Sequence, residues 1–415
     1  PWMQRWASPV HPFAASARGA EIVDVDGHRY LDLALGDTAA MAGHAPDAVV
    51  RAVADQLHRG STTMLPSEAS VEVGEELARR FGLPLWQLVL TATDANRFAL
   101  RLARMVTGRP KVLVHNWCYH GTVDETFAII DPDGASGAAI PRPGNLGAQV
   151  DPRHTTRVVE INDLAATEAA LATGDVAAIL VEPALTNIGI VRPDPGYHAA
   201  LRALATKYGA LLIVDETHTI SLGPGGATAT WSLRPDAIVI GKAIAGGMPG
   251  AAYGMNAQLA ERVGAATNLD EIDTGGIGGT VSGNVLSAVA IRATLGEVLT
   301  DAAFPGMVAG AERWADGVEE VLQRRSLGWS VARLGARAEY HFAPENPRNG
   351  GEAAAAVDHE LERYLHLHAL VRGIVITPFH NMALFSPATP ADAGARHAEA
   401  FDAAVAALQD SGALR

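Results

Sequence analysis

The sequence predicts an α/β protein built on a mostly parallel β-sheet with helices on both faces. Runs of four to six apolar residues recur along the chain with little polar alternation inside them. Such runs are typical of strands that are buried on both faces. Amphipathic stretches separate the runs, and strand–helix–strand repetition favours parallel pairing. The clearest apolar runs are 111–114, 177–181, 210–214 and 237–240.

The amphipathic stretches are predicted helices, and their lengths change along the chain. The first group lies at 95–106, 163–171 and 196–208, and longer helices are expected at 285–299, 304–323 and near 396–408. Near the N-terminus, 21–27 and 30–33 predict a hairpin, because Asp26-Gly27 favours a tight turn. We therefore expect a large α/β domain that binds the ligand and a smaller α+β domain built from both chain ends. The expected parts are 1–40 (a segment that joins the small domain), 41–284 (the large domain) and 285–415 (the small domain).

Composition narrows the classes of function. With 32 basic and 46 acidic side chains the net charge is −14, so a nucleic acid would be repelled on average. No apolar stretch reaches the roughly 18 residues that a membrane span requires. The single cysteine, Cys118, excludes a disulfide framework within the chain and any multi-cysteine zinc site. We expect an acidic cytoplasmic protein that binds small molecules, with neither nucleic acid nor membrane as a partner and no bound metal.

Polar side chains follow four of the predicted strands at the point where each strand ends. The carboxyl ends of parallel strands form the ligand-binding edge of an open sheet, so these side chains are expected in one crevice. They are Asp215 after 210–214, Lys242 after 237–240, Glu182 after 177–181 and Tyr119 beyond 111–114.

Lys242 and Asp215 together indicate a particular cofactor chemistry. Burial at a strand end lowers the pKa of a lysine and makes its amine a nucleophile for a carbonyl, which is Schiff-base chemistry. A buried aspartate needs a positive partner, and a protonated pyridine nitrogen is one. Pyridoxal 5'-phosphate offers an aldehyde to Lys242, a ring nitrogen to Asp215 and a ring face to Tyr119.

A phosphate-binding turn is expected at the start of the helix near 95. Residues 87–90 read as a strand, and the polar stretch after it leads into the helix. Thr93 is the predicted N-cap, with Asn96 at the third helical position. Free N–H groups at the helix start attract a phosphate, and the hydroxyls of Thr91 and Thr93 add hydrogen bonds beside Ala92.

Each residue also has a purely structural explanation. Lys242 alone could be a surface lysine, Asp215 a turn cap and Tyr119 a core aromatic. His120 is more often a structural hydrogen-bonding group than a metal ligand, and no second ligand is spaced for one. The lysine and the aspartate at neighbouring strand ends favour a site over these alternatives.

These residues belong to a longer series of motifs. The series is Ser8-Pro9-Val10, Asp24-Val25-Asp26-Gly27, Gly43-His44-Ala45-Pro46, Tyr119-His120-Gly121, Glu182-Pro183, Asp215-Glu216, Gly241-Lys242 and Gly279-Thr280-Val281-Ser282-Gly283-Asn284. With these motifs the chain resembles the class III (ω-type) aminotransferases of PLP fold type I, and among them the glutamate-1-semialdehyde aminomutase-like branch.

The resemblance implies a role for each matching position. Lys242 looks like the Schiff-base lysine and proton shuttle, Asp215 like the partner of the ring nitrogen and Tyr119 like the ring-stacking residue. Thr280 matches the threonine that reaches the phosphate of the neighbouring subunit, which implies a homodimer. The full set of expected cofactor-binding residues is Thr91, Ala92, Thr93, Tyr119, His120, Glu182, Asn187, Asp215, Thr217, His218, Lys242 and Thr280.

The chain departs from the family pattern at positions that bear on the substrate. His11 stands where the aminomutase branch has a carboxylate-binding arginine, and a neutral imidazole cannot form a bidentate clamp. The segment 377–386 lacks the family's glutamate, and Ala92 replaces a glycine of the phosphate loop. These departures argue against glutamate-1-semialdehyde as the substrate. The expected pocket wall is Asp37, Thr38, His11 and His380.

The main functional hypothesis is a PLP-dependent aminotransferase that moves an amino group between an amine or amino acid and a keto acid. The alternative is an aminomutase of the glutamate-1-semialdehyde type, or a racemase or decarboxylase on the same cofactor. A third hypothesis, from another class, is a homologue that binds the cofactor or a partner without turnover.

Overall fold

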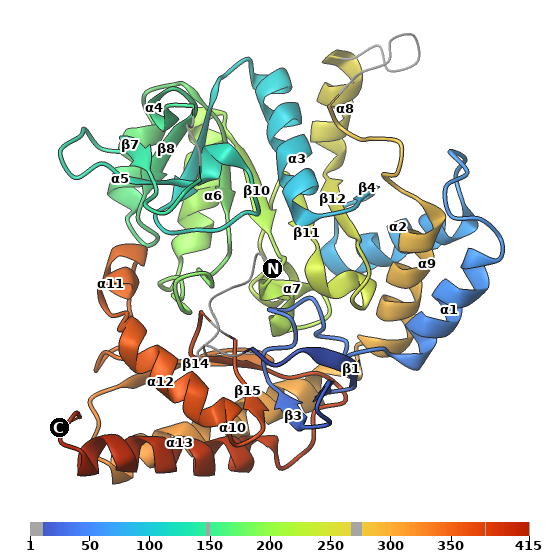
Figure 1. Ribbon diagram of the computed structural model, residues 1–415. Coiled ribbons are helices and arrows are strands. Elements are labelled where there is room, and N and C mark those ends of the chain that lie inside the picture. Colours follow the sequence, from blue (N-terminus) through green and yellow to red (C-terminus); the bar gives the residue numbers. More distant parts are fainter. Residues whose placement is uncertain (1–10, 147–149, 267–275, 378, 415) are drawn as a thin grey trace.

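A seven-stranded sheet forms the centre of the molecule (Figure 1). The computed structural model describes residues 11–146, 150–266, 276–377 and 379–414; the expected motif Ser8-Pro9-Val10 and residue Pro378 lie outside these ranges. Of the seven strands, β12 runs antiparallel to both neighbours and the others are parallel. The strand order is β4 (Leu85–Val89), β12 (Ala251–Met255), β11 (Ala237–Ile240), β10 (Leu211–Asp215), β9 (Val176–Val181), β5 (Lys111–His115) and β8 (Thr156–Val159).

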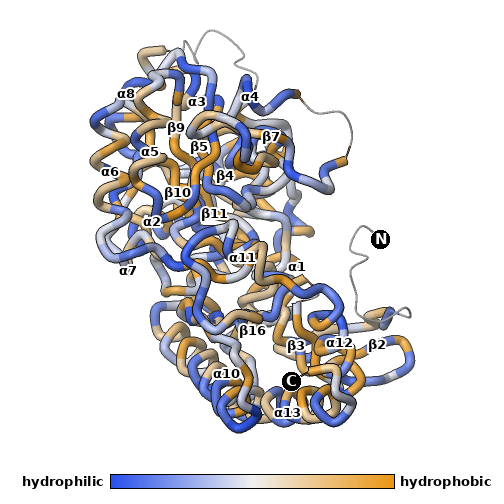
Figure 2. The backbone as a smooth tube through the Cα atoms, turned by 90° about the vertical axis from the view of Figure 1, so that its left-hand side faces the viewer, coloured by the Kyte–Doolittle hydropathy of each residue, from blue (hydrophilic) through white to orange (hydrophobic). Residues whose placement is uncertain are grey.

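The four apolar runs of the sequence are strands β5, β9, β10 and β11, as predicted. Every residue of β9, β10 and β11 is buried. Figure 2 shows hydrophobic residues concentrated on these central strands. A strand that is buried on both faces needs no polar alternation, which explains the continuous runs.

Helices cover both faces of this sheet. Helix α3 (Ala92–Thr107) packs on β9, β11 and β12, whereas α6 (Tyr197–Tyr208) packs on β10 and α5 (Leu164–Leu171) on β8. Helix α3 connects β4 to β5, whereas α5 connects β8 to β9 and α6 connects β9 to β10, so the first connection crosses the sheet in the opposite direction to the other two. Because all three connections are right-handed, α3 lies on one face of the sheet and α5 and α6 on the other. The remaining helical segments of this part are α1 (Asp47–Leu57), α2 (Glu68–Phe81), η1 (Asp124–Thr126), α4 (Pro152–Thr155), η2 (Thr219–Leu222), α7 (Gly226–Thr230), η3 (Lys242–Ala245) and α8 (Ala257–Ala266).

Two smaller sheets bring the chain ends together below the large sheet. The predicted hairpin is formed by β2 (Glu21–Asp24) and β3 (Arg29–Asp32), which follow β1 (Ala14–Arg18). Strand β15 (Ile374–Val375) pairs in parallel with β3, so segments from the two ends of the chain share one sheet. The other sheet holds β13 (Ser330–Leu334), β14 (Arg337–His341) and β16 (Met382–Leu384), and β6 (Ala128–Ile130) pairs with β7 (Ala139–Pro141) near the large sheet.

Long helices of the C-terminal part lie at the opposite end of the molecule from α3 and α8 (Figures 1 and 2). Helix α10 (Phe304–Arg324) packs along α13 (Ala393–Asp410), and α12 (His359–Leu370) packs on α13 as well. Helix α11 (Gly350–Ala355) is short. None of the helices that the structure describes is long and apolar enough to span a bilayer.

The helix expected at 285–299 is interrupted. Helix α9 (Val285–Ala293) is followed by a π-helical turn, η4 (Thr294–Val298). The Thr294 hydroxyl donates a hydrogen bond to the carbonyl of Ala290 (2.7 Å), and the amide of Leu299 donates to the carbonyl of Thr294 (2.7 Å). A threonine side chain that bonds back to the preceding turn bends a helix, which the apolar spacing alone does not predict.

Two glycines of α10 provide a matched test of the packing between this helix and β16. A Cβ on Gly310 would lie 2.5 Å from Cδ1 of Phe385, whereas a Cβ on Gly306 would meet nothing within 4 Å. We expect Gly310→Ala to lower the free energy of unfolding by about 1–3 kcal/mol through overpacking. Gly306→Ala is expected to be neutral or to raise it by up to about 1 kcal/mol. Chemical denaturation of both variants measures the difference, and equal stabilities would contradict the packing described.

Candidate active site

Lys242 lies at the carboxyl end of β11, in a tight turn against the start of α3. Its φ angle is +46°, a left-handed conformation that is uncommon for a residue other than glycine and is frequent at functional sites. The preceding residue, Gly241, lies so close to α3 that a Cβ there would be 2.9 Å from the Cβ of Ala92. The turn therefore places the lysine beside the N-terminus of α3.

The amine of Lys242 is held between a carboxylate and an imidazole. Nζ donates to Oδ2 of Asp37 (2.7 Å) and lies 2.8 Å from Nε2 of His218, and the lysine side chain is 26% exposed. Burial alone would raise the pKa of Asp37, but the charge of Lys242, with a smaller contribution from Arg337, holds it well below its ordinary value. Asp37 is thus an ionised partner of the amine.

The other nitrogen of His218 also faces a hydrogen-bond donor. Nη2 of Arg337 lies 2.9 Å from Nδ1 of His218 and donates to Oγ1 of Thr38 (2.5 Å), which is itself 2.9 Å from Nδ1. Burial lowers the pKa of His218 well below its ordinary value, and the charges of Lys242 and Arg337 lower it further. The imidazole is therefore neutral and has one acceptor nitrogen. Nη2 of Arg337 faces Nδ1 and Nζ of Lys242 faces Nε2, so one of these two donors has no acceptor on the ring.

Asp215 is buried at the end of β10 and is kept ionised by three neighbours. Its Oδ2 accepts from Nδ2 of Asn96 (2.8 Å) and pairs with Nδ1 of His120 (2.9 Å), and its Oδ1 accepts from the amide of Thr217 (3.1 Å). Burial alone would raise the pKa of Asp215, but His120, Thr217 and Asn96 outweigh it and lower the pKa. A charged carboxylate in this position can hold the proton of a pyridine nitrogen. His120 has the structural hydrogen bond that the sequence analysis favours.

The start of α3 differs from the prediction at the cap. Thr91, not Thr93, is the N-cap: its hydroxyl accepts from the amide of Asp94 (3.1 Å), and the helix begins at Ala92. Asn96 is therefore the fifth helical residue and not the third, and it is free to reach Asp215. Thr93 instead accepts from the amide of Thr122 (3.0 Å) across the turn after His120.

The helix start still presents its first N–H groups to an anion. Amides of the first turn have no partner within a helix, and the helix dipole favours negative charge there. Ala92 is an ordinary helical residue, so its replacement of the family's glycine needs no left-handed backbone. A Cβ on Gly121 would collide with Oγ1 of Thr93, so glycine at 121 permits this close approach.

Tyr119 is positioned by a buried carboxylate. Its amide donates to Oε1 of Glu182 (3.1 Å), while Oε2 of Glu182 accepts from the amide (3.1 Å) and hydroxyl (2.5 Å) of Thr186. Burial raises the pKa of Glu182, although His120 and these hydrogen bonds oppose the rise. Glu182 therefore holds the loop that carries Tyr119.

A cavity of about 820 Å³ joins these groups. Its size and its lining, which includes an amine, a carboxylate, a helix N-terminus and a tyrosine ring, fit pyridoxal phosphate. Oγ1 of Thr217 is buried and has no hydrogen-bond partner among the described residues, which leaves it available to a ligand. Of the expected site residues, those that line this cavity are Thr91, Ala92, Thr93, Tyr119, Asp215, Thr217, His218 and Lys242.

The other expected residues lie outside this lining. His120 and Glu182 are buried behind Asp215 and Tyr119, and Asn187 lines a neighbouring cavity. Thr280 is exposed in the single chain.

Of the expected pocket wall, Asp37 contacts Lys242, and Thr38 contacts His218. His380 lines the neighbouring cavity, and His11 is half-buried.

Sequence reasoning missed two residues of this arrangement, Asn96 as a partner of Asp215 and Arg337 as a partner of His218. Arg337 is fully buried, and its Nε and Nη1 have no hydrogen-bond partner among the described residues. The alternation of Arg337, Glu339 and His341 along a strand was the one available signal, because a charged residue at every second position marks one face.

Comparison with known proteins agrees with the geometry. The family model "Aminotransferase class-III" matches residues 2–397. A glutamate-1-semialdehyde 2,1-aminomutase of Desulfitobacterium hafniense is 32% identical over 385 residues, which cover 92% of this chain and 87% of the relative.

Solved structures give the same result. A glutamate-1-semialdehyde aminomutase from Pseudomonas aeruginosa is 49% identical, with a TM-score of 0.94, over 98% of this chain and 90% of that one; a variant of it was solved in complex with PMP. An ω-transaminase from Sphaerobacter thermophilus is 28% identical, with a TM-score of 0.86, over 97% of this chain and 92% of that one.

The ion pair between Asp37 and Lys242 predicts a pH-dependent stability of the apoprotein. The pKa of Asp37 is lower in the folded protein than in the unfolded chain, where it is about 4. The ionised carboxylate therefore stabilises the fold fully above about pH 4. This stabilisation is lost as the pH falls from about 4 towards the pKa of the folded state. We expect Asp37→Asn to lower the free energy of unfolding by about 1–3 kcal/mol at pH 7, and the difference to shrink below about pH 4. Denaturant unfolding over this pH range measures it. Asp55→Asn, at an exposed position of α1, is the control, and a difference that does not change with pH would contradict the assignment.

Proposed function

The chain belongs to the class-III aminotransferase family, and from this premise we propose that it is a PLP-dependent enzyme that shifts an amino group within one substrate molecule. The observation that carries the proposal is that the amine of Lys242 and the carboxylate of Asp215 line the same cavity, with the N-terminus of α3 beside them. Pyridoxal phosphate offers an aldehyde to Lys242, a ring nitrogen to Asp215 and a phosphate to the N-terminus of α3.

When bound, pyridoxal phosphate supplies an aldehyde and an electron-withdrawing ring that stabilises negative charge on a substrate carbon. Asp215 would hold the proton of the ring nitrogen, and Asn96 and His120 keep this carboxylate charged and oriented. Tyr119 would hold the ring, and the first turn of α3 would hold the phosphate. Lys242 would hold the aldehyde, and its amine would carry a proton to and from the substrate.

The neighbours of Lys242 prepare it for both tasks. Asp37 and His218 fix the position of Nζ. Thr280 is proposed to reach the phosphate of a second subunit in a homodimer, which accords with its exposure in the single chain.

The relatives support an amino shift within one molecule over transfer between two molecules. The relatives that are 32% and 49% identical to this chain are glutamate-1-semialdehyde aminomutases, whereas the ω-transaminase is 28% identical. We therefore prefer the aminomutase, which the sequence left as the alternative, to the transaminase of the main hypothesis. Transamination between an amine and a keto acid is kept as the second candidate, because the same residues perform it.

Attachment of the cofactor is testable because the chain has only three lysines, Lys111, Lys207 and Lys242. We expect the purified holoenzyme to absorb near the visible edge, and borohydride reduction followed by peptide mapping to find the pyridoxyl group on Lys242. Lys242→Ala should lose the band and at least about a thousandfold of turnover. Lys207→Ala, at a surface pair with Glu168, should retain both. A label on Lys111 or Lys207 would contradict the proposal.

The requirement for a second substrate separates the two candidate reactions. We expect wild-type enzyme to convert glutamate-1-semialdehyde through many turnovers with no keto acid added, because the amino group returns to the same carbon skeleton. Product formation is followed by chromatography with excess substrate. If conversion stops at about one equivalent per site and resumes on addition of pyruvate or 2-oxoglutarate, the transaminase candidate replaces the aminomutase.

A further inference from the structure

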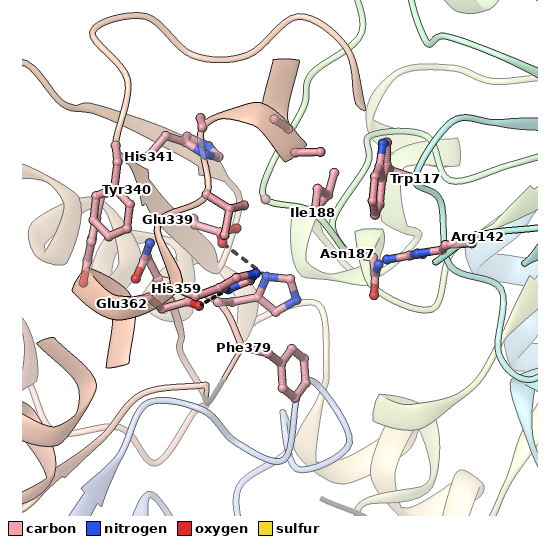
Figure 3. A pocket seen from close by; sticks show the side chains of 18 of the residues that line it. Trp117, Arg142, Asn187, Ile188, Glu339, Tyr340, His341, His359, Glu362 and Phe379 are labelled. Atoms are coloured by element: carbon pink, nitrogen blue, oxygen red, sulfur yellow. Dashed lines mark ion pairs between the residues drawn. The ribbon is translucent and has the colours of Figure 1, made fainter. Parts of the chain in front are cut away.

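The structure has a second cavity, of about 450 Å³, whose lining is shown in Figure 3. Trp117 and Arg142 line it, and Tyr119 of the same loop lines the cofactor cavity. His380 lines it as well, and its charge acts on Asp37, the partner of Lys242. The loop that carries Trp117 and Tyr119 therefore borders both cavities.

Arg142 brings an uncompensated positive charge to that wall. Its Nη1 donates to the carbonyl of Cys118 (3.1 Å), and its guanidinium lies 4.9 Å from the centre of the Trp117 ring. Within the described ranges no carboxylate oxygen lies within 4.0 Å of its guanidinium. Two other half-buried arginines, Arg104 and Arg157, are paired with Glu125 and Asp175 at 2.7 Å. Burial lowers the pKa of Arg142, so a carboxylate ligand would relieve the cost of this charge.

The guanidinium is held in a fixed position. The amide of Arg142 donates to the carbonyl of Phe127 (2.9 Å) at the end of β7, and the side chain stacks on Trp117, which has a left-handed φ of +63°. Among the described residues the carbonyl of Cys118 is the one hydrogen-bond acceptor of this side chain, so the rest of the planar group is left for a ligand. A rigid planar cation is the group that binds carboxylates in a bidentate way.

The two walls of this cavity differ in how their charges are paired. Figure 3 shows Arg142, Trp117 and Asn187 on one side, with Glu339 and Glu362 on the other. Burial alone would raise the pKa of Glu339, but His380, 3.4 Å away, lowers it, so the glutamate and the histidine on that wall form a pair. An anionic ligand group is attracted to Arg142, whose charge has no such partner among the described residues.

We infer that a substrate bound near Lys242 extends into this cavity and that Arg142 binds its carboxylate. The inference rests on the proposed function and adds the residue that determines specificity for a carboxylic acid. It also resolves the difficulty raised by His11, because the chain supplies the carboxylate-binding arginine from the end of β7 instead of from its N-terminal segment.

Matched amines test this assignment in the holoenzyme. The probes are 3-aminopropanoate, 4-aminobutanoate and 5-aminopentanoate, each paired with the alkylamine of equal chain length. The dissociation constant of each is read from the change in the visible absorption band. The wild type should bind at least one amino acid 10-fold or more tightly than its alkylamine, and Arg142→Gln should lose about 10- to 100-fold for that amino acid with no change for the alkylamine.

The variants and outcomes separate this inference from the proposed function. Arg142→Lys keeps the charge without the bidentate geometry and should fall between wild type and Arg142→Gln. Arg153→Gln, at an exposed arginine paired with Asp151, should behave as wild type. If no amino acid is preferred by the wild type, or the preference persists in Arg142→Gln, the inference is overturned. If the visible band never forms in the wild type, the proposed function itself fails.

Discussion

The position of one amine depends on groups from three distant parts of the chain. Lys242 comes from the large sheet, Asp37 from the N-terminal segment, and Arg337 reaches the same cluster through His218 from a strand of the C-terminal part. The pairing of β3 with β15 brings the two ends of the chain together. The small sheets are therefore needed to position the partners of Lys242, although Lys242 itself follows a strand of the large sheet.

Charge in the site is arranged as two separate buried groups. Asp215, with His120 and Asn96, forms a negatively charged position with a counter-charge behind it. Lys242, with Asp37, His218 and Arg337, forms a cluster in which donors compete for too few acceptors. Buried polar groups of this kind are costly unless each has a partner. The first group is suited to hold a proton on a ring, and the second to hold the amine of Lys242 in place.

The sequence predicts the parts of this site that depend on local pattern. Strands β5, β9, β10 and β11 are recognisable because they are apolar throughout, and the rule for strand ends then identifies Asp215 and Lys242. Asp37 was placed in the pocket wall, but its bond to Lys242 crosses 205 positions, and no periodicity encodes that contact. Arg337 was missed for the same reason. The cap of α3 was placed two residues late because Thr91 and Thr93 are equally good capping residues, and the choice between them depends on the contact of Thr93 with the turn at Gly121.

The reversed direction of β12 determines how freely the nucleophile moves. Parallel neighbours require a long crossover, usually a helix, but antiparallel β11 and β12 are joined by the ten residues 241–250. Lys242 therefore lies in a short connection that is fixed at both ends by the same sheet. Little conformational entropy is left for this backbone to lose when a substrate arrives, so the orientation of the amine is established during folding.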